Sequence, residues 1–202
     1  MHPPSRHPRT LRPVVSGGFG LVELLVSISI IVLITSLVLI NHSSFNGAVL
    51  LRSQAYEVAL RAREVQLFAV SVVGESGDFR NTYGLHFDST VSTNPFYRIF
   101  RDADGDNYYD SDEEFGTQGF LDTRFEIREL RVVGGPSDGT TPNSVSVVFA
   151  RPNFDARFFN AASSDLSANR LEIDVSRVNS SGSGPGEVRT IEISRTGQIS
   201  VQ

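Results

Sequence analysis

A run of apolar residues near the N-terminus limits the possible folds of this chain more than any other feature. From Leu21 to Ile40 the sequence reads LVELLVSISIIVLITSLVLI, in which Glu23 is the only charged residue. Twenty helical residues span roughly 30 Å, the thickness of the hydrocarbon core of a bilayer. The run therefore predicts one transmembrane helix, which we place at residues 19–40.

The eighteen residues before this helix are basic and rich in proline. They contain Arg6, Arg9 and Arg12, and all 23 acidic residues of the chain lie after them. They lack the apolar run of about seven residues that a secretory signal peptide needs. Because positive charges keep their flank of a membrane helix in the cytoplasm, we expect residues 1–18 to be a cytoplasmic leader and the chain after residue 41 to be exported.

The composition argues against several kinds of site. The chain has 202 residues, 40% of them apolar, which is enough for one domain and an appendage. It has no cysteine, so disulfides, thiolate metal sites and cysteine nucleophiles are excluded. Outside the leader only His42 and His86 are histidines. With no nucleophile motif, histidine pair or phosphate-binding glycine loop, the chain is not expected to be an enzyme.

Glu23 is the unusual residue of the apolar run. A charge at the centre of a membrane helix costs about 2.5 to 3.5 kcal/mol, and less near its end, so such a residue usually has a partner or a purpose. Three interpretations are open. Glu23 belongs to a plain signal anchor and lies at the headgroup level, or it makes a buried polar contact within a membrane complex, or it is part of an assembly signal.

The residues around Glu23 favour the third interpretation. The segment from Ser16 to Val26 reads SGGFGLVELLV. It resembles the cleavage and methylation motif of type IV pilins and type II secretion pseudopilins, in which glycine precedes the cut, phenylalanine usually follows it, and glutamate is the fifth residue of the mature chain. Gly18, Phe19 and Glu23 stand at these three positions.

The resemblance implies processing and assembly. A prepilin peptidase would cut between Gly18 and Phe19, and the new amino group of Phe19 would be methylated. Glycine offers no side chain to obstruct the peptidase. The amine of a neighbouring subunit would then pair with Glu23 inside an apolar filament core, because a carboxylate in low dielectric favours a facing ammonium. The partners implied are the peptidase, other pilin or pseudopilin subunits and the inner membrane.

The helix is expected to continue beyond the membrane. Apolar residues recur at spacings of three and four from Leu50 to Ala69, which indicates an amphipathic helix that packs on its own domain. Gly47 is a point where it could bend. We expect this continuation over residues 41–75, with the helix ending near Val73 because Gly74 and Gly77 follow.

Residues 76–202 are expected to form the exported domain. Short alternating segments separated by Gly, Pro, Asn and Asp are typical of an antiparallel sheet. The predicted strands are Tyr83–Phe87, Phe96–Arg101, Phe125–Val133, Ser144–Phe149, Leu171–Arg177, Arg189–Arg195 and Gln198–Val201, with a hairpin at Thr196–Gly197 and a surface loop from Asn179 to Gly186. The fold class is α+β: a long N-terminal helix on a mainly antiparallel sheet.

This arrangement resembles the GspH/FimT class of minor pseudopilins and pilins. The segments Tyr83–Phe87 and Ile193–Ile199 carry the resemblance. One branch of that class binds DNA through arginines near the C-terminus. The corresponding stretch here, Thr196–Gln202, has none, and the net charge of the chain is -5, so nucleic acid is not an expected partner.

An acidic segment predicts a calcium site. Counted from Asp102, the donors stand where an EF-hand loop has its ligands: Asp102, Asp104, Asp106, the carbonyl of Tyr108, Asp110 through a water, and Glu113. Position six is Asn107 in place of glycine, and the flanks do not read as two helices. The alternative is a solvated acidic turn. A bound Ca²⁺ would be structural and would stabilise a domain without disulfides.

The leading functional hypothesis is a structural subunit, a minor pilin or pseudopilin, that passes from the cytoplasmic membrane into a filament. The alternatives are a binding module, a minor pilin that contacts DNA or a surface, and a single-pass anchored domain stabilised by calcium. A binding module needs an exposed aromatic or basic patch. Phe154, Phe158 and Phe159 beside Arg151 and Arg157 are the candidates, although a buried loop cluster explains them better.

Overall fold

A computed structural model describes residues 18, 20–71, 82–91, 96–150, 154–182 and 186–202. Its first element is the helix α1 (Leu21–Val70), which is continuous through Gly47. By its contacts the chain divides into two units, residues 1–43 and 44–202, so that α1 contributes to both. We describe the two units separately.

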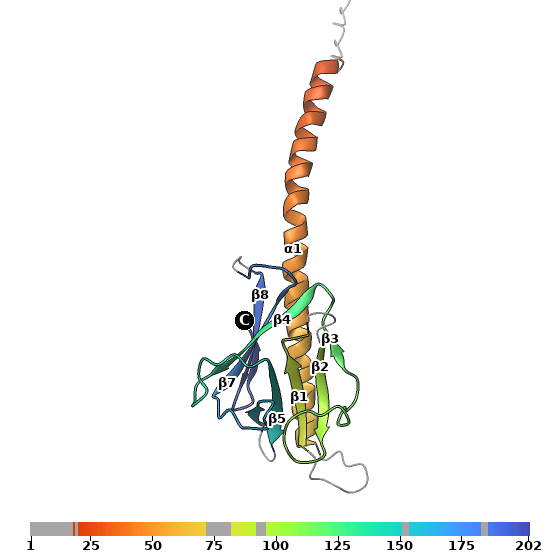
Figure 1. The fold of residues 1–202 in the computed structure, drawn as a ribbon. Coiled ribbons are helices and arrows are strands. Elements are labelled where there is room, and N and C mark those ends of the chain that lie inside the picture. The colour runs from red at the N-terminus through yellow and green to blue at the C-terminus, as the bar shows by residue number, and fades with distance from the viewer. Residues whose placement is uncertain (1–17, 19, 72–81, 92–95, 151–153, 183–185) are drawn as a thin grey trace, which may run out of the picture. The chain divides into compact units, whose positions relative to one another are not determined.

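The second unit contains two antiparallel sheets. In the first, the strand order is β3-β2-β1-β5-β6, and in the second it is β4-β7-β8-β9. The strands are β1 (Thr82–Asp88), β2 (Phe96–Asp102), β3 (Gly119–Phe120), β4 (Phe125–Val133), β5 (Ser144–Ala150), β6 (Asp155–Phe159), β7 (Arg170–Arg177), β8 (Val188–Ser194) and β9 (Ile199–Val201). The described residues therefore form an α+β domain, as the sequence predicts (Figure 1).

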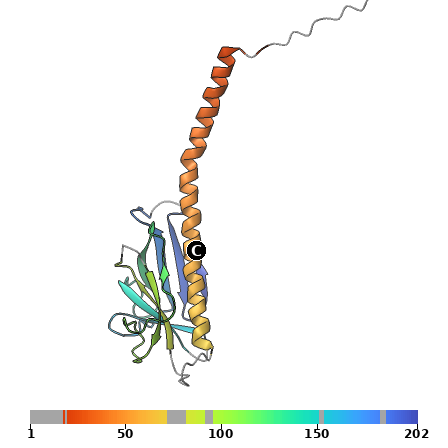
Figure 2. The ribbon, with the colours of Figure 1, turned by 90° about the vertical axis from the view of Figure 1, so that its right-hand side faces the viewer.

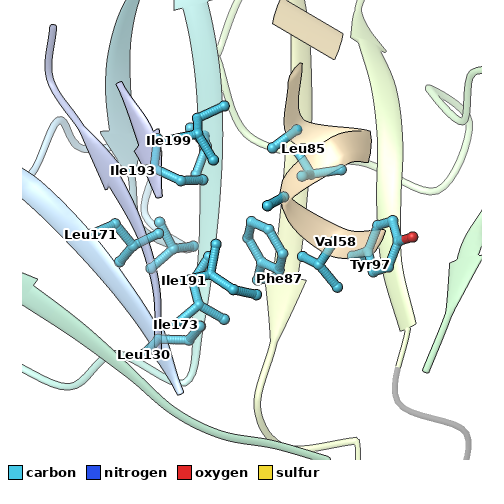
Figure 3. Close-up of a cluster of buried hydrophobic side chains, with 14 of the residues drawn as sticks. Val58, Leu85, Phe87, Tyr97, Leu130, Leu171, Ile173, Ile191, Ile193 and Ile199 are labelled. Atoms are coloured by element: carbon cyan, nitrogen blue, oxygen red, sulfur yellow. The ribbon is translucent and has the colours of Figure 1, made fainter. Parts of the chain in front are cut away.

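One hydrophobic core joins both sheets to the second half of α1. Leu51, Ala55 and Ala62 of the helix are fully buried in it, and Figure 3 shows Phe87 of β1 between Val58 of α1 and Ile191 of β8. Small alanine side chains bring the helix backbone close to the sheets, while branched side chains from alternate strand positions fill the space between them. The amphipathic pattern of the sequence thus correctly identifies the buried helix face.

The predicted strands all occur, with small shifts at their ends, but two further strands were not predicted. β3 is too short to show any alternation, and β6 holds residues that the sequence assigned to a loop. The helix ends at Val70, three residues before the position near which the sequence predicts its end, and the hydroxyl of the next residue, Ser71, donates to the Phe68 carbonyl at 3.3 Å. Serine competes for the last helix carbonyls in this way. Gly74 and Gly77 lie outside the described residues.

The expected hairpin near the C-terminus is present. The Gly197 amide donates to the Ser194 carbonyl at 2.9 Å, and Gly197 has φ 79°, a conformation that glycine adopts without strain. β8 and β9 pair across this hairpin. β7 and β8 also pair, so the segment from Asn179 to Gly186 connects neighbouring strands, although residues 183–185 are not described.

Replacing Phe87 by alanine should destabilise the domain strongly. The side chain is fully buried where helix and sheets meet. Removing a buried phenylalanine ring costs about 3 to 5 kcal/mol of unfolding free energy. Phe120→Ala is the matched control, because this side chain is 57% exposed, and it should cost less than about 1 kcal/mol. Denaturant unfolding of the full chain in detergent measures both, and equal costs would contradict the described core.

Candidate functional site

Two of the three residues of the predicted cleavage motif fall in the described part of the chain. Gly18 is exposed and lies outside any helix or strand, and Phe19 is not described. The helix begins directly after this segment, with the Leu24 amide donating to the Gly20 carbonyl at 3.1 Å. Glu23 therefore lies in the first turn of α1, two residues from its start.

The first part of α1 is an apolar surface that the described residues leave exposed. Residues Leu21–Leu39 are long and apolar enough to cross a membrane, and none of this segment is buried. Its serines do not present free hydroxyls: Ser27, Ser29 and Ser36 each donate to the carbonyl four residues earlier, at 2.7 to 2.9 Å. Such bonds satisfy polar side chains without water, as the interior of a bilayer requires. By length and composition, the helix is compatible with a membrane anchor or a signal sequence.

The acidic loop after β2 brings three of its predicted ligands together. Asp102, Asp104 and Asp106 each offer one carboxylate oxygen, and these oxygens lie within 4.8 Å of one another. The backbone curls around them, with Asn107 at φ 65° at the turn where an EF-hand has glycine. Three converging carboxylates are the hard oxygen donors that Ca²⁺ prefers. The described geometry thus accommodates the central part of the predicted ligand set.

Asp110 and Glu113 are not part of this group of carboxylates. Glu113 uses both carboxylate oxygens on backbone amides, accepting from Ala103 at 2.6 Å and from Asp110 at 3.2 Å. It thereby closes the loop by linking its two ends. The side chain of Asp110 is exposed, and Asp106 accepts from the Ser163 hydroxyl at 2.7 Å. An acidic turn held by its own hydrogen bonds is also compatible with these contacts.

Burial affects two acids of the loop. Asp102 and Glu113 are 7% and 6% exposed. Desolvation raises the pKa of both carboxyl groups, and for Asp102 the charges of Asp104 and Asp106 raise its pKa further, while backbone amide donors act in the opposite direction. The loop therefore concentrates negative charge where water solvates it poorly. A bound cation would offset that cost.

An aromatic cluster fastens the acidic loop to the first sheet. His86 of β1 is buried between the rings of Tyr108 and Tyr109, whose centroids lie 5.1 and 5.0 Å from its own. Its Nδ1 lies 2.9 Å from the Ser146 hydroxyl of β5. The Tyr108 hydroxyl is also within hydrogen-bonding distance, 2.7 Å, of the Ser144 hydroxyl. These contacts fix the position of the loop on the sheet.

Sequence reasoning missed this attachment. His86 and Ser146 lie far apart in the chain and meet only because β1 pairs with β5 in the register that places them opposite each other. In the sequence, only the polar residues that alternate along these two strands hinted at a contact between His86 and Ser146. Ser163, which donates to Asp106, likewise comes from the turn after β6. Its contribution depends on tertiary structure alone.

The aromatic patch considered for a binding module is largely buried. Phe158 and Phe159 are 1% and 3% exposed and belong to strand β6. The prediction that they are buried is therefore confirmed, and the prediction that they lie in a loop is wrong. Phe154 is 44% exposed. Arg157 pairs with Asp165 at 3.0 Å, and Arg151 lies outside the described residues. The described members of this set therefore do not form a continuous exposed patch.

A comparison of the chain with protein-family models, with curated proteins and with solved structures finds no match.

Calcium should stabilise the domain if the acidic loop binds it. At a dissociation constant of about 0.1 to 1 mM, 10 mM Ca²⁺ would add about 1.4 to 2.7 kcal/mol of unfolding free energy. Thermal unfolding of the full chain with CaCl₂ or MgCl₂ measures this. Asp104→Asn should abolish the stabilisation by Ca²⁺. Asp112→Asn should preserve it, because Asp112 is an exposed acid of the same loop that lies outside the ligand pattern. An unchanged melting temperature in Ca²⁺ would support the solvated turn.

His86 should make stability depend on pH below neutrality. Burial is the main cause that lowers its pKa from 6.5 to about 4. The folded protein therefore holds neutral histidine while the unfolded chain takes up a proton, so stability falls as the pH drops from about 6.5 to 4, by up to about 3 kcal/mol. His86→Gln should remove that part of the loss. Parallel pH profiles of unfolding free energy for the wild type and the variant would contradict this assignment.

Proposed function

We propose that this chain is a pilin-like structural subunit, cut between Gly18 and Phe19 and assembled into a filament through its N-terminal helix. The observation that carries the proposal is the order of features along α1. The proposed cut site directly precedes an apolar helical surface, with Glu23 in its first turn, that the described residues do not bury. The same helix continues into the core of an antiparallel domain.

This order of features gives each part of the chain a physical role. Before cutting, the apolar segment lies in the cytoplasmic membrane, with the basic leader on the cytoplasmic side and the domain on the other. After cutting, neighbouring helices can replace the lipid around it. The carboxylate of Glu23 is then costly in apolar surroundings unless a cation faces it, and the new amino group of Phe19 is the cation that processing creates.

The proposal covers a type IV pilus and a type II secretion pseudopilus alike. The resemblance of the β-rich domain to minor subunits of the GspH/FimT class favours a minor subunit. Calcium binding at the acidic loop stays a prediction of this proposal, in which the ion would stabilise the exported domain. A plain membrane anchor with the same exported domain is the alternative that an absence of cutting would favour.

The N-terminus of the protein recovered from membranes tests the proposal. We expect the full chain, co-expressed with a prepilin peptidase, to begin at Phe19 and to carry one added methyl group, as measured by intact mass and N-terminal sequencing. Without the peptidase, residues 1–18 should remain. A chain that keeps its first 18 residues in the presence of active peptidase would contradict the proposal.

Two glycine variants separate recognition from folding. Gly18→Val should block the cut, because the peptidase then meets a branched side chain immediately before the bond. Gly20→Val is the matched control and should still be cut. A Cβ atom at either glycine meets nothing within 4 Å, so neither change disturbs packing in the described structure. Equal processing of the two variants would contradict recognition of Gly18.

A further inference from the structure

The domain half of α1 carries an exposed apolar stripe on the side that faces away from the sheets. We define the apolar seam as Val49, Tyr56, Leu60 and Leu67, which are 51%, 49%, 66% and 62% exposed. They are spaced by seven, four and seven residues, so on a helix they lie within about 20° of one line. Figure 2 shows the sheets on one side of this part of the helix, and the fully buried Leu51, Ala55 and Ala62 face them.

The spacing of the apolar seam is that of a helix-packing surface. Apolar residues that recur every seven residues, with intervals of three and four, pack against the same pattern on another helix. Ser53 and Arg63 occupy the remaining positions of the pattern. Exposed large apolar side chains that line up along one helix face indicate an interaction site. Within the second unit, the described residues leave the seam without a covering element.

The charges beside the apolar seam specify the direction of a partner helix. Arg52 lies on one flank, and Glu57 and Glu64 lie on the other, where Glu64 already pairs with Arg61 of its own helix at 2.7 Å. When two identical helices pack in parallel, the basic flank of each meets the acidic flank of the other. When they pack antiparallel, like flanks meet and repel. The flanks therefore favour an identical helix that runs in the same direction.

A groove beside the apolar seam offers room for a partner's side chains. It has a volume of about 280 Å³ and lies between α1 and β9, lined by Tyr56, Ala59, Leu60, Arg63, Ile199, Ser200 and Val201. Arg63 donates to the Ile199 carbonyl at 3.0 Å, which holds the helix and the edge strand together as the two walls. Apolar side chains from a second helix can enter this groove while its charged residues remain at the rim.

We propose that the apolar seam of α1 binds the same seam of a second copy of this chain, with the two helices parallel. In register, Arg52 faces Glu57 of the second copy, and after a displacement of one heptad it faces Glu64. The inference rests on the proposed function, since it names a partner for the helix that would assemble. A membrane anchor holds both copies in one orientation, so it favours the same parallel arrangement.

Cysteine cross-linking tests the seam directly, because the chain has no cysteine of its own. In membranes that contain the full chain and the peptidase, oxidised Leu60→Cys should form disulfide-linked dimers, or should link to Leu67→Cys if the copies are displaced by one heptad. Phe120→Cys is the matched control, an exposed apolar residue on β3, and should link at least about fivefold less. Equal yields from Leu60→Cys and Phe120→Cys would overturn the proposal.

A second pair of variants tests the direction. Val49→Cys and Leu67→Cys lie about 27 Å apart along one helix, so they should not link to each other between parallel copies. They come close when the copies are antiparallel, and a strong link between them would overturn the proposal. Failure of Leu60→Cys to link with itself or with Leu67→Cys would show that another occupant, or none, covers the seam.

Charge reversal tests the flanks in the Leu60→Cys background. Where Leu60→Cys links to itself, Arg52→Glu or Glu57→Arg alone should lower the dimer yield by about twofold to fivefold, and the double variant should restore it. Where Leu60→Cys links instead to Leu67→Cys, Glu64→Arg takes the place of Glu57→Arg in the same test. Arg195→Glu makes the same charge change at an exposed residue away from the seam and should have no effect. Single reversals without effect, or a double variant without recovery, would contradict the charge pairing.

The cross-linking experiment can fail or succeed independently of the test for cutting between Gly18 and Phe19. A chain that is cut at Gly18 but does not link through the seam would refute this inference alone. A chain that keeps its leader and still links through Leu60→Cys would refute the pilin-like function and leave a self-associating membrane protein.

Discussion

The apolar surface of Leu21–Leu39, none of which the described residues bury, is the constraint on which the rest of the structure depends. At about 25 cal/mol for each Å² of apolar surface, leaving a helix of this length in water is prohibitive. The surface therefore needs lipid, or other helices, at every stage. In the proposed function, lipid covers it first and neighbouring subunits cover it later. The carboxylate of Glu23 is the one charge in this segment, and burying it in lipid or among other helices costs free energy. The proposed amine partner would offset that cost.

The second half of the same helix solves a different problem, the stability of a domain without disulfides. Its alanine-rich face joins two sheets into one core, so the domain is stabilised by packing. The acidic loop is attached to that core through His86, Tyr108 and Tyr109, and it gathers three carboxylates at the end of β2. Its unbalanced charge is a cost of folding that a cation could offset. The opposite face of the helix is left apolar, and the flanking charges give a second copy one favoured direction.

The sequence predicted those features of the fold that depend on the residue pattern within a single helix or strand. The apolar run, the buried helix face and most strands depend on local periodicity, and all were predicted. β3 escaped notice because two residues carry no period, and β6 was taken for a loop because its two adjacent phenylalanines hide the alternation. In the acidic loop, the carboxylates of Asp102, Asp104 and Asp106 converge as their spacing suggests, while the contacts of Glu113 with backbone amides at the loop ends could not be read from the sequence. The His86 and Ser146 contact required the register of β1 with β5, which no local pattern specifies.

The pairing of Glu23 with a neighbour's new amino group is the most direct test of the account. Filaments or membranes that contain equal amounts of unlabelled and ¹⁵N-labelled chain would be treated with a hydrophobic carbodiimide, which joins a carboxylate to an amine in contact with it. We predict a linked peptide that connects Phe19 of one copy to Glu23 of another, with one half unlabelled and the other labelled. Recovery of Glu23 only in unlinked peptides, or of an N-terminus that still begins at Met1, would contradict the account.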